Sequence, residues 1–196
     1  MILALCIVFT SCVHVLPDSE ANSVAIFLST ESDDITVGSL VTIDVLVTNM
    51  SSENVYITRL KSWPLKAFGG WAGWSLTIDG QDGQWSFVHA PSLPPPITEH
   101  DIVELKPYES YTKKIDVSSA IMRAEHPRQH LQDTPGVYTF SIDYLLKEHH
   151  LALGRALRTA SSNALTAGLE QSLYRGPITS NELTINIKDN DTEPNK

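Results

Sequence analysis

The side chains best suited to metal chemistry in this sequence are histidines. His126 and His130 stand four residues apart, the spacing that places two zinc ligands on one face of a helix, and His149 and His150 follow later. Pro127 lies inside the first pair and disfavours a helix there. The alternative interpretation is a set of solvated loop histidines whose charge changes near neutral pH. We favour that alternative and expect no metal and no other cofactor.

Motifs of nucleophilic or nucleotide chemistry are absent from the sequence. It contains no G-x-S-x-G nucleophile turn, no G-x-x-x-x-G-K-S/T loop and no G-x-G-x-x-G loop. Its 14 basic and 23 acidic residues give a net charge of −9, and its densest basic feature is the pair Lys113-Lys114. A nucleic-acid-binding surface needs clustered cations. The sequence therefore indicates neither an enzyme nor a nucleic-acid-binding protein.

Aromatic residues are concentrated in one stretch. All four tryptophans lie within 23 residues, with one phenylalanine among them and a second two residues beyond: Trp63, Phe68, Trp71, Trp74, Trp85 and Phe87. Exposed, they would form a platform that stacks on sugars or anchors a protein interface. Buried, they would fill the core of a two-sheet fold, which the alternation of Trp74 and Trp85 with Leu76 favours for these two. The candidate partner contacts in this stretch are Trp63, Phe68, Trp71 and Trp74.

A proline-rich loop, residues 90–96, follows the aromatic stretch. Pro94, Pro95 and Pro96 favour an extended polyproline II conformation and cannot donate backbone hydrogen bonds. One role is a rigid wedge presented to a partner, which makes these prolines further candidate contacts. The other role, which we favour, is a spacer that also blunts a sheet edge against aggregation.

The first twelve residues resemble an export signal. No charged residue precedes Asp18, and the apolar run over residues 1–9 is too short to cross a bilayer of about 30 Å at about 1.5 Å per residue. Phe9-Thr10-Ser11-Cys12 resembles a bacterial lipoprotein box, in which the cysteine receives lipid. The alternative is an ordinary signal peptide cleaved a few residues later. We expect Cys12 to be lipidated, and Val13 in place of aspartate directly after it implies the outer membrane.

Beyond residue 23 the chain alternates between apolar and polar residues in short segments. The clearest is residues 40–48, in which Val41, Ile43 and Val45 alternate with polar residues. About nine such segments, separated by turn residues, predict two antiparallel sheets packed face to face. We expect a signal peptide over residues 1–12, a tether over 13–23, the sandwich over 24–188 with a partly helical insertion over 151–173, and a flexible tail over 189–196.

Single residues predict the local geometry of three turns. Asn49 ends a strand where an Asx side chain can bond its own backbone and start a turn. Pro107 has a fixed φ that favours a tight turn between two strands. Gly136 gives the next strand an entry residue that tolerates positive φ.

Several landmarks follow one another in an order that is typical of a known family: residues 41–49, Trp63-Pro64-Leu65, Ile78-Asp79-Gly80, residues 103–110, 114–118, 136–142 and 180–183. The chain resembles the immunoglobulin-like domain that precedes the catalytic domain in secreted deuterolysin-type (peptidyl-Lys) zinc endopeptidases, and more loosely the BsuPI-type proteinase inhibitors. The resemblance implies an immunoglobulin-like β-sandwich, with glycine expected where Tyr108 stands. The H-E-x-x-H motif of the peptidase domain is absent, so the resemblance implies the accessory sandwich without the enzyme half.

Together these observations predict an all-β, immunoglobulin-like antiparallel β-sandwich with a short helical insertion before the last strand. We expect it to be a non-catalytic binding module of the cell envelope, held by a lipid anchor and engaging a protein partner, with a protease that it restrains as one candidate. The alternative is a binder of carbohydrate or envelope polymer through exposed tryptophans.

Overall fold

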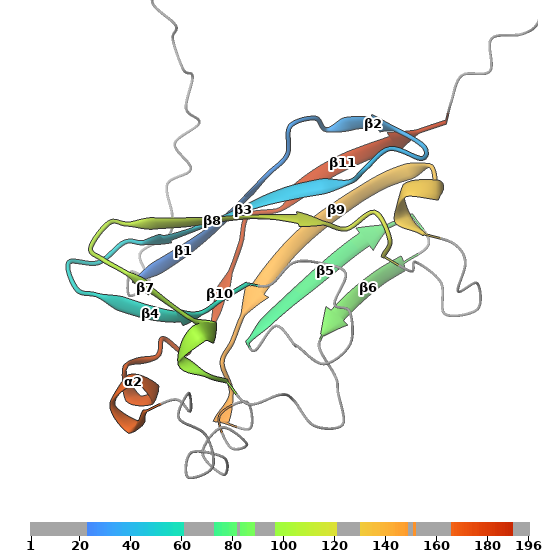
Figure 1. The fold of residues 1–196 in the computed structure, drawn as a ribbon. Helices are drawn as coiled ribbons and strands as arrows, with labels where there is room; N and C mark the ends of the chain where they lie inside the picture. The colour runs from blue at the N-terminus through green and yellow to red at the C-terminus, as the bar shows by residue number, and fades with distance from the viewer. Residues whose placement is uncertain are drawn as a thin grey trace, which may run out of the picture.

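The computed structural model describes residues 23–60, 73–81, 83–88, 97–120, 130–148, 151 and 166–189. Within these residues the chain is mostly β-strand, with one short α-helix and two 3-10 helices (Figure 1). The strands are β1 (Val24–Ser29), β2 (Asp34–Thr36), β3 (Thr42–Asn49), β4 (Val55–Thr58), β5 (Trp74–Gly80), β6 (Gly83–Val88), β7 (Ile102–Leu105), β8 (Ser110–Asp116), β9 (Gly136–Tyr144), β10 (Ile178–Thr179) and β11 (Leu183–Lys188). The helices are η1 (Glu99–Asp101), η2 (Leu131–Asp133) and α2 (Ala167–Ser172), and α2 lies inside the predicted insertion.

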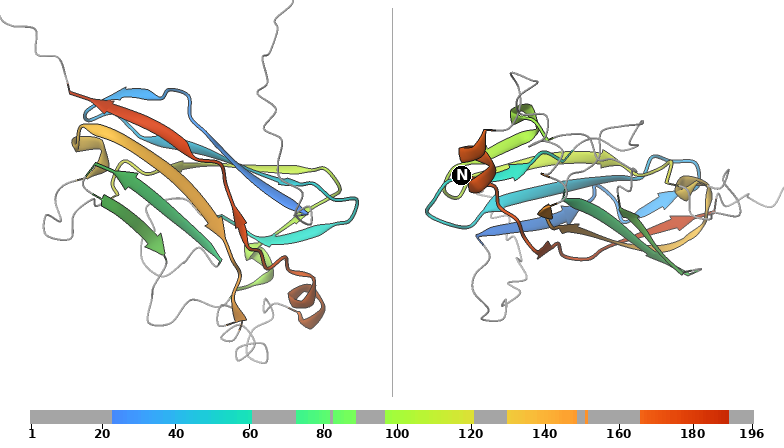
Figure 2. Two further views of the ribbon diagram at one scale, coloured as in Figure 1. Left: turned by 180° about the vertical axis from the view of Figure 1, so that it is seen from behind. Right: turned by 90° about the horizontal axis from the view of Figure 1, so that it is seen from below.

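Most of the strands form two layers that face each other, and β4 pairs antiparallel with β7 in a separate two-stranded sheet (Figures 1 and 2). One layer has the order β1-β3-β8, and the other has the order β2-β11-β9-β5-β6, with β10 paired to β9. The first part of the chain contributes to both layers, because β1 pairs antiparallel with β3 whereas β2 pairs parallel with β11. The orders β11-β9-β5-β6 and β1-β3-β8 match strands G-F-C-C′ and A-B-E of the immunoglobulin arrangement. The predicted all-β sandwich is confirmed.

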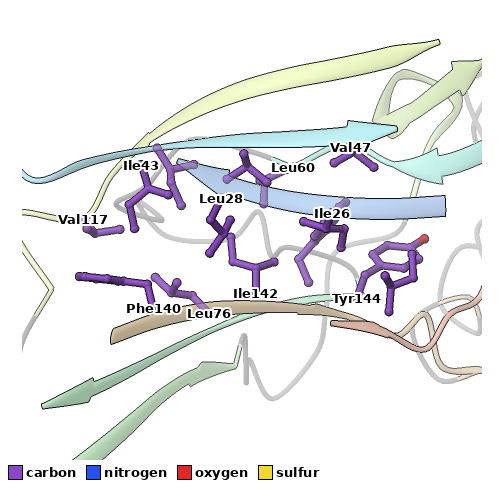
Figure 3. Packing of buried hydrophobic residues seen from close by; sticks show 14 of the residues in the cluster. Ile26, Leu28, Ile43, Val47, Leu60, Leu76, Val117, Phe140, Ile142 and Tyr144 are labelled. Atoms are coloured by element: carbon purple, nitrogen blue, oxygen red, sulfur yellow. The ribbon is translucent and has the colours of Figure 1, made fainter. Parts of the chain in front are cut away.

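The core lies between the layers and follows from residue alternation. In β3, Ile43, Val45 and Val47 are fully buried, while the intervening residues are partly exposed. Figure 3 shows side chains from both layers meeting in this space, among them Ile43 from β3 and Phe140 from β9. Period-two patterning thus places one face of each strand inward and the other toward solvent.

A tyrosine side chain forms a hydrogen bond to the backbone just before β9. The Tyr138 hydroxyl donates a hydrogen bond to the Thr134 carbonyl oxygen at 3.1 Å. This is the tyrosine corner of immunoglobulin-like domains, in which a tyrosine near the start of strand F bonds backbone a few residues upstream. Gly136 has a φ of 153°, as predicted for the strand entry. Two residues after the tyrosine, where antibody domains have a cysteine, Phe140 is fully buried.

The turn between β7 and β8 has the type II pattern. The Glu109 N–H donates to the Lys106 carbonyl at 3.0 Å, with Pro107 at the second position and Tyr108 at the third. Tyr108 has a φ of 60°, which the third position requires and which glycine adopts more readily. The turn that Pro107 favours therefore forms, with a tyrosine at the position where the resemblance implied glycine.

Candidate functional site

Most of the predicted contact residues lie outside the described part of the chain. These are the predicted lipidation residue and the loop contacts, namely Cys12, Trp63, Phe68, Trp71, Pro94, Pro95 and Pro96. Only one histidine of the predicted pair is described by the structure, because His126 lies outside the described residues. His130 lies within them, with its Nδ1 at 3.2 Å from the Ser119 carbonyl oxygen. No group of three or more His, Cys, Asp or Glu residues suited to a metal occurs in the described ranges.

Trp74 belongs to the core, so it is not available as a surface contact for a partner. Its exposed fraction is 2%, and its indole N–H donates to the Thr58 carbonyl oxygen at 2.9 Å. Its ring centroid lies 4.7 Å from that of Tyr144. The reason is strand alternation, since β5 turns Trp74 to the same side as the buried Leu76 and Ile78. Of the two interpretations of this tryptophan, the structure supports the core role.

A buried hydrogen-bond network surrounds Trp74. The Tyr144 hydroxyl donates to the Tyr174 carbonyl at 3.0 Å and lies 3.4 Å from the Thr58 backbone nitrogen. Burial raises the pKa of Tyr144 to about 12, and its hydrogen bonds with Thr58 offset part of that rise. This network joins β4, β5, β9 and the chain after α2, and it leaves no reactive group at the surface. Its role is structural.

A small pocket opens at the opposite end of the first sheet, where the chain passes from β1 to β2. We call it the crossover pocket. Its volume is about 140 Å³, and its walls are Thr30, Glu31, Ser32, Ile35, Leu40, Val41, Thr42 and Ile185. Val41 and Ile185 are buried beneath it, whereas Leu40 beside it is 67% exposed. The crossover pocket therefore combines an apolar interior with hydroxyl groups and one exposed leucine.

Two carboxylate–lysine ion pairs lie at and near the crossover pocket. Glu31 forms an ion pair with Lys114 at 2.5 Å, and Lys114 lies 3.9 Å from Asp44. The hydrogen bond with Lys114 lowers the pKa of Glu31, and the same bond raises the pKa of Lys114. Nearby, Lys188 pairs with Asp34 at 2.7 Å, which lowers the pKa of that carboxyl. The carboxylates of Glu31 and Asp34 therefore remain ionised at neutral pH, each paired with a lysine.

The size of the crossover pocket limits what it can bind. Sites for cofactors and small substrates usually enclose about 300–1,000 Å³. A volume of about 140 Å³ suits one aliphatic side chain instead. Covering Leu40 in the same contact would contribute up to about 2 kcal/mol, because its side chain is largely solvated. The geometry thus fits a side chain of a protein partner.

Sequence reasoning missed the crossover pocket, although one signal for it was present. Leu40 and Val41 are consecutive apolar residues at the start of a strand. Because neighbouring residues of a strand face opposite sides, one of the two had to face outward. The position of Ile185 beside them could not be predicted, since it depends on how β11 pairs.

A scan against protein-family models and a search of curated proteins both find no match to this chain. The likeness to the deuterolysin accessory domain and to BsuPI-type inhibitors thus remains a hypothesis from the sequence. Among the helices that the structure describes, none is long and apolar enough to cross a membrane.

Proposed function

We propose that this chain is a non-catalytic binding domain of the cell envelope that engages a protein partner through the crossover pocket. The observation that carries the proposal is the exposed Leu40 beside a pocket sized for one aliphatic side chain. The loop residues Trp63, Phe68, Trp71 and Pro94 to Pro96 remain proposed additional contacts.

A matched pair of variants tests the role of the crossover pocket. Leu40 and Met50 are both exposed, at 67% and 52%, and they flank opposite ends of β3. Purified native protein, Leu40→Lys and Met50→Lys would each be used to capture proteins from envelope extract. We expect Leu40→Lys to lose at least one specific partner that native protein and Met50→Lys retain. Equal capture by all three would remove the crossover pocket from the binding surface.

A protease is the specific partner class that the family resemblance suggests. If the partner is a protease, the purified domain slows its hydrolysis of a protein substrate, and Leu40→Lys slows it much less. Unchanged hydrolysis at saturating domain would reject the inhibitor role and leave the binding role intact. The carbohydrate alternative has less support, because the buried Trp74 cannot join a stacking platform.

The proposed anchor is a lipid on Cys12. Cells that express the chain would be labelled with radioactive palmitate and fractionated. We expect label in the protein and loss of that label in Cys12→Ala, with the protein moving from the membrane fraction to the soluble fraction. Labelling that is unaffected by Cys12→Ala would remove the anchor. The binding test above does not depend on this result.

A further inference from the structure

The edges of the sheets differ in how well they are protected from pairing with another chain. Edge strands present unpaired N–H and C=O groups, and proteins usually protect them with charges, short length or covering groups. The edge strand β8 carries Lys113 and Lys114. At β1 the Asn181 side chain covers the edge, since its Oδ1 accepts from the Leu28 N–H at 2.7 Å and its Nδ2 donates to the Leu28 carbonyl at 3.2 Å.

The remaining edges outside β6 are short or covered. β2 has three residues and begins with Asp34. β7 has four residues and includes Glu104. At β4, the Tyr174 N–H donates to the Tyr56 carbonyl at 2.7 Å, and Leu173 forms a parallel bridge with Tyr56.

Within the described part of the chain, β6 has none of these protections. It is six residues long with the sequence GQWSFV, which contains no charged residue and no proline. It pairs with β5 on one side, and within the described residues no strand pairs with its other side. It lies at the outer margin of the larger sheet (Figure 1). Strands of this composition readily pair with further strands.

The hairpin register decides which backbone groups of β6 face outward. Gly80 and Gly83 are opposite each other across a two-residue turn, so they form a hydrogen-bonded pair. Hydrogen-bonded pairs alternate along an antiparallel ladder, and residues 85 and 87 therefore also bond to β5. The N–H and C=O groups of Gln84, Ser86 and Val88 consequently point away from the sheet.

We propose that β6 pairs antiparallel with β6 of a second copy of this chain, around a two-fold axis at Ser86. In this register Ser86 is opposite its own copy, and Gln84 is opposite Val88, so the outward-facing groups meet as hydrogen-bonded pairs. Residue 85 of each strand is then opposite residue 87 of the other, as a non-hydrogen-bonded pair. The strand is uncharged, and therefore no like charges become opposite one another.

The second copy fits this edge better than the other long edge. Self-pairing of β8 around Lys114 would place two lysines directly opposite each other, which is destabilising. The proposed pairing joins the two larger sheets into one continuous sheet. The crossover pocket lies by β2 and β11, at the far margin of that sheet, so the assembly leaves it free and does not depend on the proposed function.

Cysteine cross-linking tests the register directly. The experiment uses the full chain with Cys6→Ser and Cys12→Ser, which contains no other cysteine. In a hydrogen-bonded antiparallel pair the Cα atoms are about 5.5 Å apart, which a disulfide spans. We expect Ser86→Cys to give a reducible dimer under mild oxidation and the matched control Gln84→Cys to give very little. Equal yields from the two variants would overturn the register.

Sedimentation equilibrium of the same cysteine-free chain tests the assembly itself. We expect a mass that rises from one chain to two with concentration, and more dimer at higher salt, because salt screens the repulsion between two chains of charge −9. Ser86→Pro removes an outward N–H and is expected to prevent the rise, and Gln84→Lys provides a second variant without the backbone change. A single-chain mass at every concentration, or dimers in both variants, would refute the proposal.

Discussion

The side-chain Nδ2 of Asn49 donates a hydrogen bond to the carbonyl oxygen of Leu105 at 3.0 Å, across 56 residues of sequence. The same nitrogen lies 2.7 Å from the Glu53 carbonyl and 3.0 Å from the Lys106 carbonyl. The Asn49 Oδ1 accepts from the Ser51 N–H at 2.9 Å, which is the predicted Asx turn. Asn49 is fully buried, and its amide fixes the corner at which the β3–β8 ribbon continues into β4 and β7.

Replacing this amide should destabilise the corner. Asn49→Asp keeps the acceptor for Ser51 but cannot donate to the three carbonyls, and it buries a charge beside them. We expect the free energy of unfolding to fall by about 3 kcal/mol, since each buried polar group left without a partner costs about 1–3 kcal/mol. Urea denaturation measures this change. The matched control is Ser51→Ala at the same turn, which leaves the bonds donated by Asn49 in place. If Ser51→Ala lowers the free energy of unfolding as much as Asn49→Asp does, the donated bonds are unimportant.

Tyr108 is held in a conformation that suits glycine. Its φ of 60° costs a non-glycine residue about 1–2 kcal/mol, and its side chain is 70% exposed, so little packing is lost on removal. Tyr108→Gly relieves this strain, although glycine also gives the unfolded chain more conformational entropy, which offsets part of the gain. We expect the free energy of unfolding to rise by about 0.5–1 kcal/mol. Thermal unfolding of Tyr108→Gly and Tyr108→Ala would be compared. A fall in stability with glycine would assign the tyrosine side chain a stabilising contact.

Alkaline pH should weaken the fold through Tyr144. Burial raises the pKa of this hydroxyl to about 12 from an ordinary value near about 10. Because the folded pKa is the higher one, the stabilising effect is complete below pH 10 and is lost as the pH rises toward 12. The loss is about 2–3 kcal/mol.

A tyrosine-to-phenylalanine variant isolates that contribution. Tyr144→Phe removes the donor to the Tyr174 carbonyl and is expected to lower stability at pH 7 by about 1–2 kcal/mol. It should also flatten the decline in stability between pH 10 and 12, measured by urea denaturation at each pH. The same steep decline in Tyr144→Phe would assign the alkaline sensitivity to other groups, such as Tyr111 and Tyr174, whose pKa values burial also raises.

Gly80 is required by the ring packed over it. A Cβ at this position would lie 2.8 Å from the ring of Tyr138 and 3.1 Å from that of Trp85. Gly80→Ala should therefore cost about 1–3 kcal/mol of stability through overpacking. Gly168 in α2 is the matched control, because a Cβ there meets no atom within 4 Å and alanine favours a helix. Equal effects of the two alanines on the thermal midpoint would contradict this account.

Residue alternation by itself determined where most strands lie and which side of each faces inward. The nine segments predicted from the sequence correspond to nine strands of the structure, and Asn49, Pro107 and Gly136 stand where their turn preferences placed them. These features depend on neighbours within a few residues, so local chemistry is sufficient to specify them. The core position of Trp74 follows from the same alternation along β5.

Only the tertiary structure decided the features that join distant segments. β2 and β10 have three and two residues, too few to show an alternation, and they exist because β11 and β9 offer them partners. The crossover pocket needs Ile185 beside Leu40, and the exposed side of β6 is defined by which strand lies next to it. Which strands become neighbours depends on packing across the whole core. A short stretch of sequence therefore does not specify the neighbours of its own strand.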